Sequence, residues 1–131
     1  MTAQRRANSS GTILVVDDHV VLRMCLCDAL EMAGYEVVTA RNGLHGLAIL
    51  NAMVSPPDLI LTDLFMDRMD GKQFLQSARA DERWQNVPFL FISGLVNSVG
   101  NVSGVPCLPK PFTLQQLATA VESVLTAGAI C

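Results

Sequence analysis

The stretch LILTDLFMDRMDGKQF, residues 59–74, passes from a run of aliphatic residues into three aspartates. Leu59 to Thr62 is short and apolar, which indicates a strand buried on both faces, as in a parallel sheet. Asp63 stands at the end of this strand, although aspartate is a poor strand former and its charge is costly to bury. A carboxylate in this position needs a partner for its charge.

Similar strand patterns alternate with stretches of helical period along the rest of the chain. The other expected strands are Ile13–Val16, Glu36–Ala40, Pro88–Ile92 and Val105–Leu108, and the expected helices cover 20–33, 43–52, 71–80 and 113–125. This alternation predicts an α/β fold, a doubly wound five-stranded parallel sheet with helices on both faces. The segment from Gly94 to Gly104 is rich in Gly, Asn and Ser, so we expect only a short or degenerate fourth helix there.

Capping residues mark the beginnings of three of these helices. Asn42 and Asp70 each precede a helical stretch, and both residue types are preferred N-caps. Thr113 and Gln116 have the T-x-x-Q spacing of a capping box. Asp70 is therefore interpreted as a helix cap before Gly71, separate from Asp63.

Length and composition fit a single domain without a membrane segment. The chain has 131 residues and a net charge of -3, and nine Lys and Arg are too few to form a face for nucleic acid. No apolar run reaches the roughly 20 residues of a membrane span. The four cysteines lack metal-site spacing, which favours buried thiols in a cytoplasmic protein. We expect a tail at 1–11, a domain at 12–127 and a second tail at 128–131.

Five polar residues follow the ends of four different expected strands. They are Asp17, Asp18, Asp63, Ser93 and Lys110. The carboxyl ends of parallel strands share one edge of the sheet, which is where ligands bind in this architecture. Three carboxylates gathered there repel one another unless a cation neutralises them, and hard oxygen ligands suit Mg²⁺. A lysine and a hydroxyl beside the metal would complement an anion such as a phosphoryl group.

Five short motifs contain these residues or lie close to them: VVDD (15–18), DLILTD (58–63), DG (70–71), FISG (91–94) and LPKPF (108–112). In this combination the chain resembles the response-regulator receiver domain, and the resemblance runs from about Thr12 to Thr126. The resemblance implies a flavodoxin-like fold of the CheY-like superfamily with strand order 2-1-3-4-5. It also implies a regulatory phosphoacceptor of two-component signalling, in which Asp63 receives a phosphoryl group from the phosphohistidine of a sensor histidine kinase or histidine phosphotransfer protein.

The resemblance implies a role for each of the polar residues that follow the strand ends. Asp18 would bind Mg²⁺ directly with help from Asp17, while Asp63 would supply a metal oxygen and the nucleophile. The backbone carbonyl of Phe65 would be a further metal ligand, and Lys110 would draw charge from the phosphoryl oxygens.

Two further features follow from the same resemblance. Ser93 would hydrogen-bond the phosphoryl group and act as the switch, with Gly94 leaving space beside it. The Lys110–Pro111 peptide bond would be cis.

The sequence departs from the receiver pattern at several positions. Asp67 replaces the usual proline after the phosphoacceptor, which should leave that turn looser. Cys107 stands where receivers have an aromatic switch residue, so coupling through this position should be weakened or absent. Phe65 and Leu95, two residues beyond Asp63 and Ser93, are apolar where the hydrolytic water would approach. We expect them to exclude water and prolong the life of the phosphoaspartate.

Three readings of the function remain open. The first is a stand-alone receiver that switches an unidentified downstream protein without binding nucleic acid or membrane. The second is a pseudo-receiver that only docks proteins. The third is a haloacid-dehalogenase-like phosphohydrolase, which needs an acid where Phe65 stands. His19 and His45 lack the spacing of a metal or catalytic pair and are interpreted as surface residues.

Overall fold

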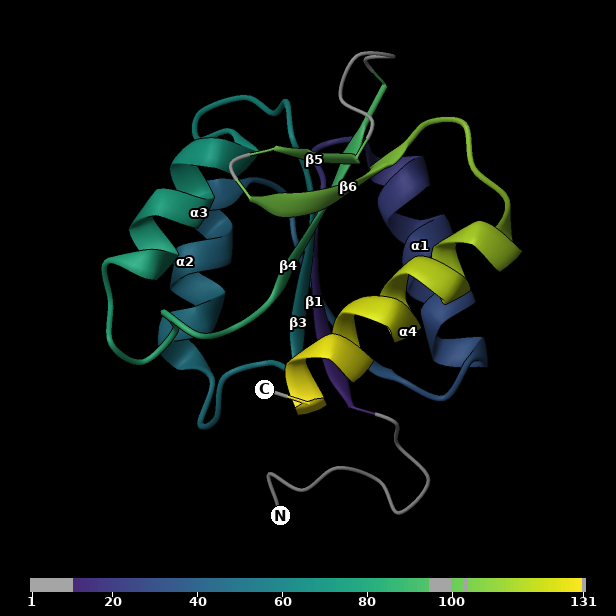
Figure 1. Cartoon of the computed structure of the whole chain (residues 1–131). Coiled ribbons are helices and arrows are strands. Elements are labelled where there is room, and N and C mark those ends of the chain that lie inside the picture. The colour runs from purple at the N-terminus through teal and green to yellow at the C-terminus, as the bar shows by residue number, and fades with distance from the viewer. Residues whose placement is uncertain (1–10, 95–99, 103, 131) are drawn as a thin grey trace.

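The computed structural model describes residues 11–94, 100–102 and 104–130, which form a sheet between two layers of helices (Figure 1). The expected N-terminal tail lies outside the described residues except for Gly11. The elements in chain order are β1 (Thr12–Val16), α1 (Val20–Met32), β2 (Glu36–Ala40), α2 (Gly43–Ala52), β3 (Leu59–Asp63), α3 (Gly71–Arg79), β4 (Phe89–Ser93), β5 (Gly100–Val102), β6 (Val105–Pro109) and α4 (Leu114–Ile130).

The sheet has the order β2-β1-β3-β4-β6-β5. Strands β1, β2, β3, β4 and β6 pair in parallel, so counting these five along the chain gives the expected order 2-1-3-4-5. β1 and β3 lie inside the sheet, and apart from the half-buried Thr12 their residues, most of them aliphatic, are buried. The prediction of a flavodoxin-like doubly wound sheet is confirmed.

The segment expected to hold a fourth helix contains a strand. Gly100–Val102 forms β5, which pairs antiparallel with β6 at the edge of the sheet. Gly104 has a φ of 79°, a conformation that glycine adopts without strain, and this allows the chain to reverse directly into β6. Residues 95–99 and 103 lie outside the described part, so the fourth helix, expected to be short or degenerate, is not found among the residues described.

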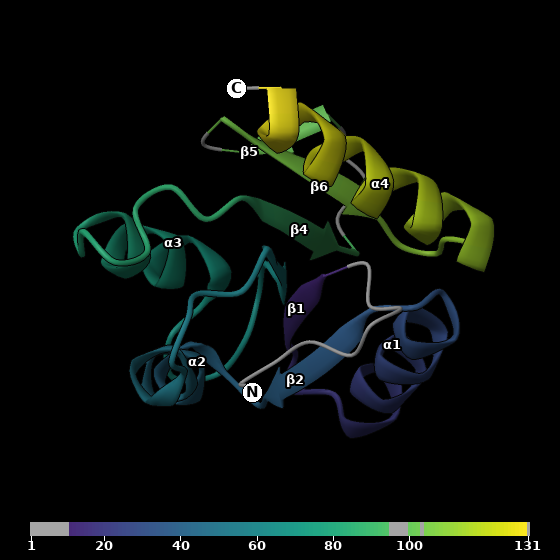
Figure 2. The same ribbon diagram turned by 90° about the horizontal axis from the view of Figure 1, so that it is seen from below.

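Two helices cover each face of the sheet (Figure 2). α2 and α3 pack on one face, over a core that includes Phe74, Phe89 and Phe91. α1 and α4 pack on the other, over a core that includes Leu30 and Leu117. Among the residues that the structure describes, no helix has the length and apolar character needed to cross a membrane.

The expected caps are present at the beginnings of three helices. The Asn42 side chain accepts a hydrogen bond from the His45 backbone N–H at 2.8 Å. Asp70 and Gln73 form a reciprocal capping box at α3. Thr113 and Gln116 form another before α4. At its other end α4 continues to Ile130, so the expected tail at 128–131 overlaps the last turn of this helix.

Candidate functional site

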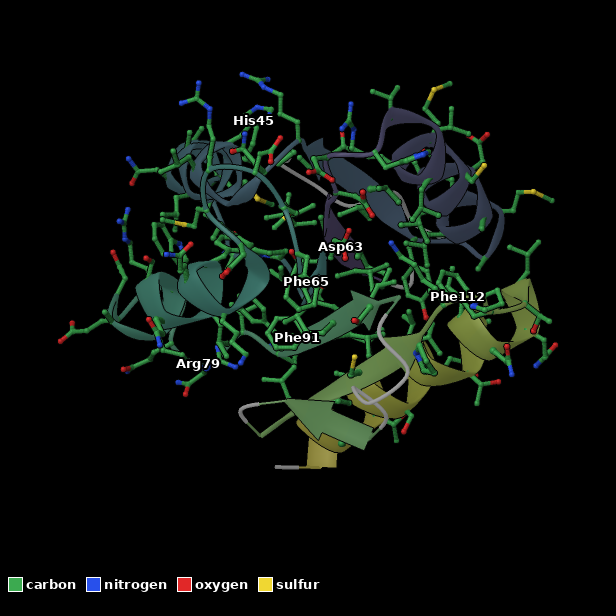
Figure 3. The ribbon with its side chains drawn as sticks, turned by 90° about the horizontal axis from the view of Figure 1, so that it is seen from above. His45, Asp63, Phe65, Arg79, Phe91 and Phe112 are labelled. Atoms are coloured by element: carbon green, nitrogen blue, oxygen red, sulfur yellow. The ribbon has the colours of Figure 1, made fainter. Side chains whose placement is uncertain are left out.

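Three carboxylates meet at the edge of the sheet where the parallel strands end. Asp17 and Asp18 follow β1, and Asp63 is the last residue of the neighbouring strand β3. Each offers one oxygen to a cluster in which these atoms all lie within 4.8 Å of one another. Figure 3 looks onto this edge and places Asp63 near its centre. The predicted gathering of the three acids is therefore observed.

Asp17 is fully buried, which is unusual for a carboxylate. One of its oxygens, Oδ1, accepts a hydrogen bond from the His19 backbone N–H at 2.8 Å. The other, Oδ2, is buried without a hydrogen-bond partner among the described residues. Burial raises the pKa of Asp17, and the charge of Asp63 raises it further, against the lowering effect of the His19 N–H. An orphan oxygen beside two other carboxylates is the donor set that a hard cation such as Mg²⁺ fits.

Asp63 is 8 % exposed and faces a lysine. The Nζ of Lys110 lies 3.4 Å from Asp63 Oδ2. Burial raises the pKa of Asp63, while Lys110 and the backbone N–H of Phe65 oppose that shift. The Asp63 carboxylate thus has both a cation and two other acids as neighbours, an arrangement that can hold both a metal ion and an anion.

Ser93 and Lys110 are held together by their backbones. Ser93 ends β4, pairs with Pro109 of β6, and accepts a hydrogen bond from the Lys110 N–H at 2.7 Å. The Ser93 residue is fully buried, whereas the Lys110 side chain is 30 % exposed. The Lys110–Pro111 bond is cis, as expected. At Gly94 an added Cβ would meet no atom of the described residues within 4 Å.

The loop between β3 and α3 is fixed close to the acids. The Asp67 N–H donates to Asp18 Oδ2 at 3.2 Å, a bond that a proline at this position could not make. Arg68 has a φ of 69°, which is uncommon for a residue with a side chain. A Cβ on Gly71 would lie 2.6 Å from the Asp63 carbonyl oxygen. With Asp67 in place of the usual proline, the loop therefore gains a hydrogen bond to the site. The sequence predicted only a looser turn here and did not predict this bond.

The remaining candidates lie around this centre. Phe65 is 53 % exposed and stands next to Asp63 (Figure 3). Leu95 lies outside the described residues. Cys107 is buried in the core of the α2–α3 face, and burial together with the charge of Asp63 raises the pKa of its thiol.

Two residues near the site have contacts that were not predicted from the sequence. His19 caps α1 by accepting the Leu22 N–H on its ring, although histidine is not a preferred cap residue. Arg23 donates to the Asp17 carbonyl at 2.7 Å from the first turns of α1. No motif marks an arginine at this distance from the acids, and only the helix that follows Asp18 brings it back to them.

Comparisons with known proteins agree with this geometry. The family model of the response regulator receiver domain matches residues 13–122. A probable chemotaxis protein CheY of Rhizobium etli is 32 % identical over 121 residues, which cover 88 % of this chain and 92 % of that protein. Sensor kinase CckA of Brucella abortus is 33 % identical over 124 residues, which cover 90 % of this chain and only 13 % of the kinase.

A solved structure matches the fold as well. The chemotaxis response regulator CheY4 of Vibrio cholerae superposes with a TM-score of 0.78 at 29 % identity, covering 86 % of this chain and 97 % of that one. The chain thus spans nearly the whole of small chemotaxis regulators but a small part of the kinase.

Proposed function

This chain belongs to the response regulator receiver domain family of two-component signalling, and from that premise we propose that Asp63 accepts a phosphoryl group from a phosphohistidine in a reaction that requires Mg²⁺. The observation that carries the proposal is the cluster of Asp17, Asp18 and Asp63 with Lys110 beside it. The protein is a regulatory receiver rather than a conventional enzyme, and the only chemistry we propose for it is its own phosphorylation and dephosphorylation.

The residues at the site fit a magnesium ion. Asp17, Asp18 and Asp63 would hold it, together with the backbone carbonyl of Phe65. The buried Oδ2 of Asp17 supports this assignment, because it has no hydrogen-bond partner among the described residues. When bound, the ion supplies positive charge shared between the carboxylate and the phosphoryl oxygens.

The transfer itself is a displacement at phosphorus. A carboxylate oxygen of Asp63 attacks the phosphorus of the phosphohistidine and a P–O bond forms. The P–N bond breaks, and its electron pair returns to the imidazole of the donor. Lys110, 3.4 Å from the carboxylate, stabilises the negative charge of the phosphoryl oxygens. The backbone N–H of Phe65 helps to orient the attacking carboxylate.

Ser93 is the residue that would read the new phosphoryl group. It ends β4 beside Asp63, whose own partner in the sheet register is Ile92. A hydrogen bond from its hydroxyl to the phosphoryl group would draw the end of β4 inward and change the surface offered to a partner. Cys107 cannot take part as an aromatic switch, because a thiol has no ring to exchange between exposed and buried positions.

We further propose the partners of the reaction. The phosphoryl donor is a sensor histidine kinase or a histidine phosphotransfer protein, and the recipient of the signal is an unidentified protein in the cytoplasm. Similarity to segments of sensor kinase CckA and of the sensor histidine kinase CheAY of Helicobacter pylori is consistent with such a donor.

Acetyl phosphate and a beryllofluoride salt, each with Mg²⁺, test the proposal. Intact mass should show a single phosphoryl adduct with acetyl phosphate, and NMR should show shifts around Asp63 with beryllofluoride. Asp63→Asn should abolish both. Asp70→Asn is the matched control, since it removes a carboxylate from the same loop while asparagine still caps α3.

Two outcomes would overturn phosphoacceptor function. One is the absence of any adduct on the wild-type chain, and the other is an equal adduct on Asp63→Asn. The first would leave the docking-only module as the better description, which the small residue at Cys107 favours.

A further inference from the structure

Strands β4 and β6 pair along only part of their length. Their parallel ladder joins Phe91–Ser93 to Cys107–Pro109. The earlier residues of β6, Val105 and Pro106, are not part of this ladder, although they pair with β5 on the opposite edge of β6. In Figure 2 the two strands lie closest at the tip of β4 and diverge toward its beginning. A wedge therefore opens in the sheet at the end away from Asp63.

This wedge contains a cavity of about 540 Å³. Its wall is mostly apolar and comes from the beginning of β4, from β6 and from the second half of α4, with Phe89, Leu90, Val105, Leu108, Ala120 and Val124 among the lining residues. Cavities of several hundred Å³ with apolar walls and few polar groups are typical of small-molecule sites. None of the three acids of the candidate phosphoryl site lines it.

Arg79 contributes a positive charge to this wall. It is the last residue of α3 and extends toward the strands (Figure 3). Its guanidinium lies 5.1 Å from the centre of the Phe89 ring and donates one hydrogen bond, at 2.7 Å, to the Val87 carbonyl. Arg79 is an exposed residue overall, and partial desolvation by the surrounding protein lowers the pKa of its guanidinium.

No acid among the described residues forms an ion pair with Arg79. Within the described residues the ion pairs are Arg83 with Asp81 and Lys110 with Asp63, and neither includes Arg79. A guanidinium has five N–H donors in a planar fork suited to a carboxylate. The Val87 carbonyl accepts one of them, so the fork retains donors for an anion.

We propose that the cavity between β4, β6 and α4 is a binding site for a small monocarboxylate with an apolar body. The apolar walls accept the body of the ligand, and Arg79 at the rim binds its carboxylate. The separation of charge and apolar surface in the cavity selects an amphipathic anion over a neutral polar compound. The proposal does not depend on phosphorylation of Asp63.

Calorimetric titration with decanoate, kept below its micelle-forming concentration, tests the site. Saturable binding to the wild-type chain is expected. Arg79→Met should weaken decanoate binding by about tenfold or more, because a charge-assisted hydrogen bond is lost. The same variant should bind decanol, which has no charge, as the wild type does. Arg83→Met is the matched control: Arg83 also stacks on an aromatic ring, that of Trp84, yet it is paired with Asp81 and does not line the cavity.

Filling the cavity gives a second, independent measurement. Ala120→Phe places a ring in the space and should abolish binding of both probes, whereas Thr119→Phe, on an exposed position of the same helix, should not. Circular dichroism verifies that each variant is folded. If Ala120→Phe does not fold, the comparison of Arg79→Met with Arg83→Met decides whether the cavity binds the carboxylate. Absence of saturable decanoate binding, equal affinity in Arg79→Met, or unchanged binding in folded Ala120→Phe would overturn the proposal.

Discussion

We expect Phe65, two residues beyond Asp63, to lie where water would reach a phosphorylated Asp63. Its side chain is 53 % exposed and apolar, so it can shield the acyl phosphate without assisting an attacking water molecule. We predict that Phe65→Asn speeds the loss of phosphate at least severalfold, because an amide can hold a water molecule that a phenyl ring excludes. Phosphate loss is followed by phosphate-affinity electrophoresis after removal of acetyl phosphate. Phe65→Leu should retain the slow rate, and an unchanged rate in Phe65→Asn would contradict the hypothesis.

The surroundings of His45 lower the pKa of its imidazole. Burial lowers its pKa, and the charges of Arg41 and Arg23 lower it further. Its Nδ1 also accepts a hydrogen bond from the Arg41 N–H, which requires the neutral ring. Below the usual histidine pKa near 6.5, the unfolded chain takes up a proton that the folded chain resists. The stabilising contribution of His45 is therefore lost as the pH falls from about 6.5 toward the lowered pKa of His45 in the folded chain.

An NMR titration of the imidazole protons checks this expectation. The midpoint for His45 should lie below 6.5, and Arg41→Gln should raise it, because one of the two nearby charges is removed while the burial of the ring remains. A midpoint that does not move in Arg41→Gln would show that the charge of Arg41 does not contribute to the lowered pKa.

At the scale of elements, the beginning of α3 is packed directly against the end of β3. A Cβ at Gly71 would lie 2.6 Å from the Asp63 carbonyl oxygen and 2.9 Å from the Leu64 Cα, both of them backbone atoms that cannot swing aside. We predict that Gly71→Ala lowers the free energy of unfolding by about 1–3 kcal/mol, the usual cost of overpacking. Urea denaturation measures the change.

Gly94→Ala is the control for this prediction. Within the described part of the chain the added methyl group would meet nothing within 4 Å, so its effect on unfolding should be much smaller. Equal losses in the two variants would mean that glycine flexibility, rather than the contact with Asp63, explains the effect at Gly71.

The elements that could be predicted from the sequence were those with a strong local signal. Asn42, Asp70 and Thr113 fixed three helix beginnings, since their side chains satisfy backbone N–H groups that the helix itself leaves free. β5 was not predicted, because three residues of Gly, Asn and Val have no periodicity and form a strand only through pairing with β6. The length of α4 beyond residue 127 was also missed, as Ala and Gly near a chain end carry little signal.

At the scale of the molecule, three carboxylates gathered at one edge of the sheet repel one another, so we expect a bound cation to stabilise the fold. We predict that Mg²⁺ raises the melting temperature of the wild-type chain by several degrees, because at a hundredfold excess over Kd a ligand adds about 2.7 kcal/mol to stability. EDTA should reverse the effect. Differential scanning calorimetry with and without Mg²⁺ makes the measurement.

Asp17→Asn should lose most of this response while remaining folded. The amide relieves the cost of a buried charge, so without Mg²⁺ the variant should be at least as stable as the wild type. Asp28→Asn removes an equal charge from an exposed position on α1 and should keep the full response to Mg²⁺. A wild-type melting temperature that ignores Mg²⁺ would contradict the assignment of the metal ligands.

The members of the site could be named from the sequence because each follows a strand in a parallel sheet. Such strands end at one edge, so Asp17, Asp63 and Lys110 are brought together by topology alone. Contacts made by backbone groups could not be foreseen in this way. The hydrogen bond from Arg23 to the Asp17 carbonyl depends on the direction in which α1 leaves the sheet.

The hydrogen bond from the Asp67 N–H to Asp18 has a kinetic consequence. The carboxylate that would receive an arriving cation also anchors the loop over the site, so entry of the ion and release of the loop would involve the same side chain. A proline at position 67 would uncouple the two events, because it has no N–H to donate. In this chain the identity of one loop residue, which touches neither phosphorus nor metal, can thus set how fast the site is loaded.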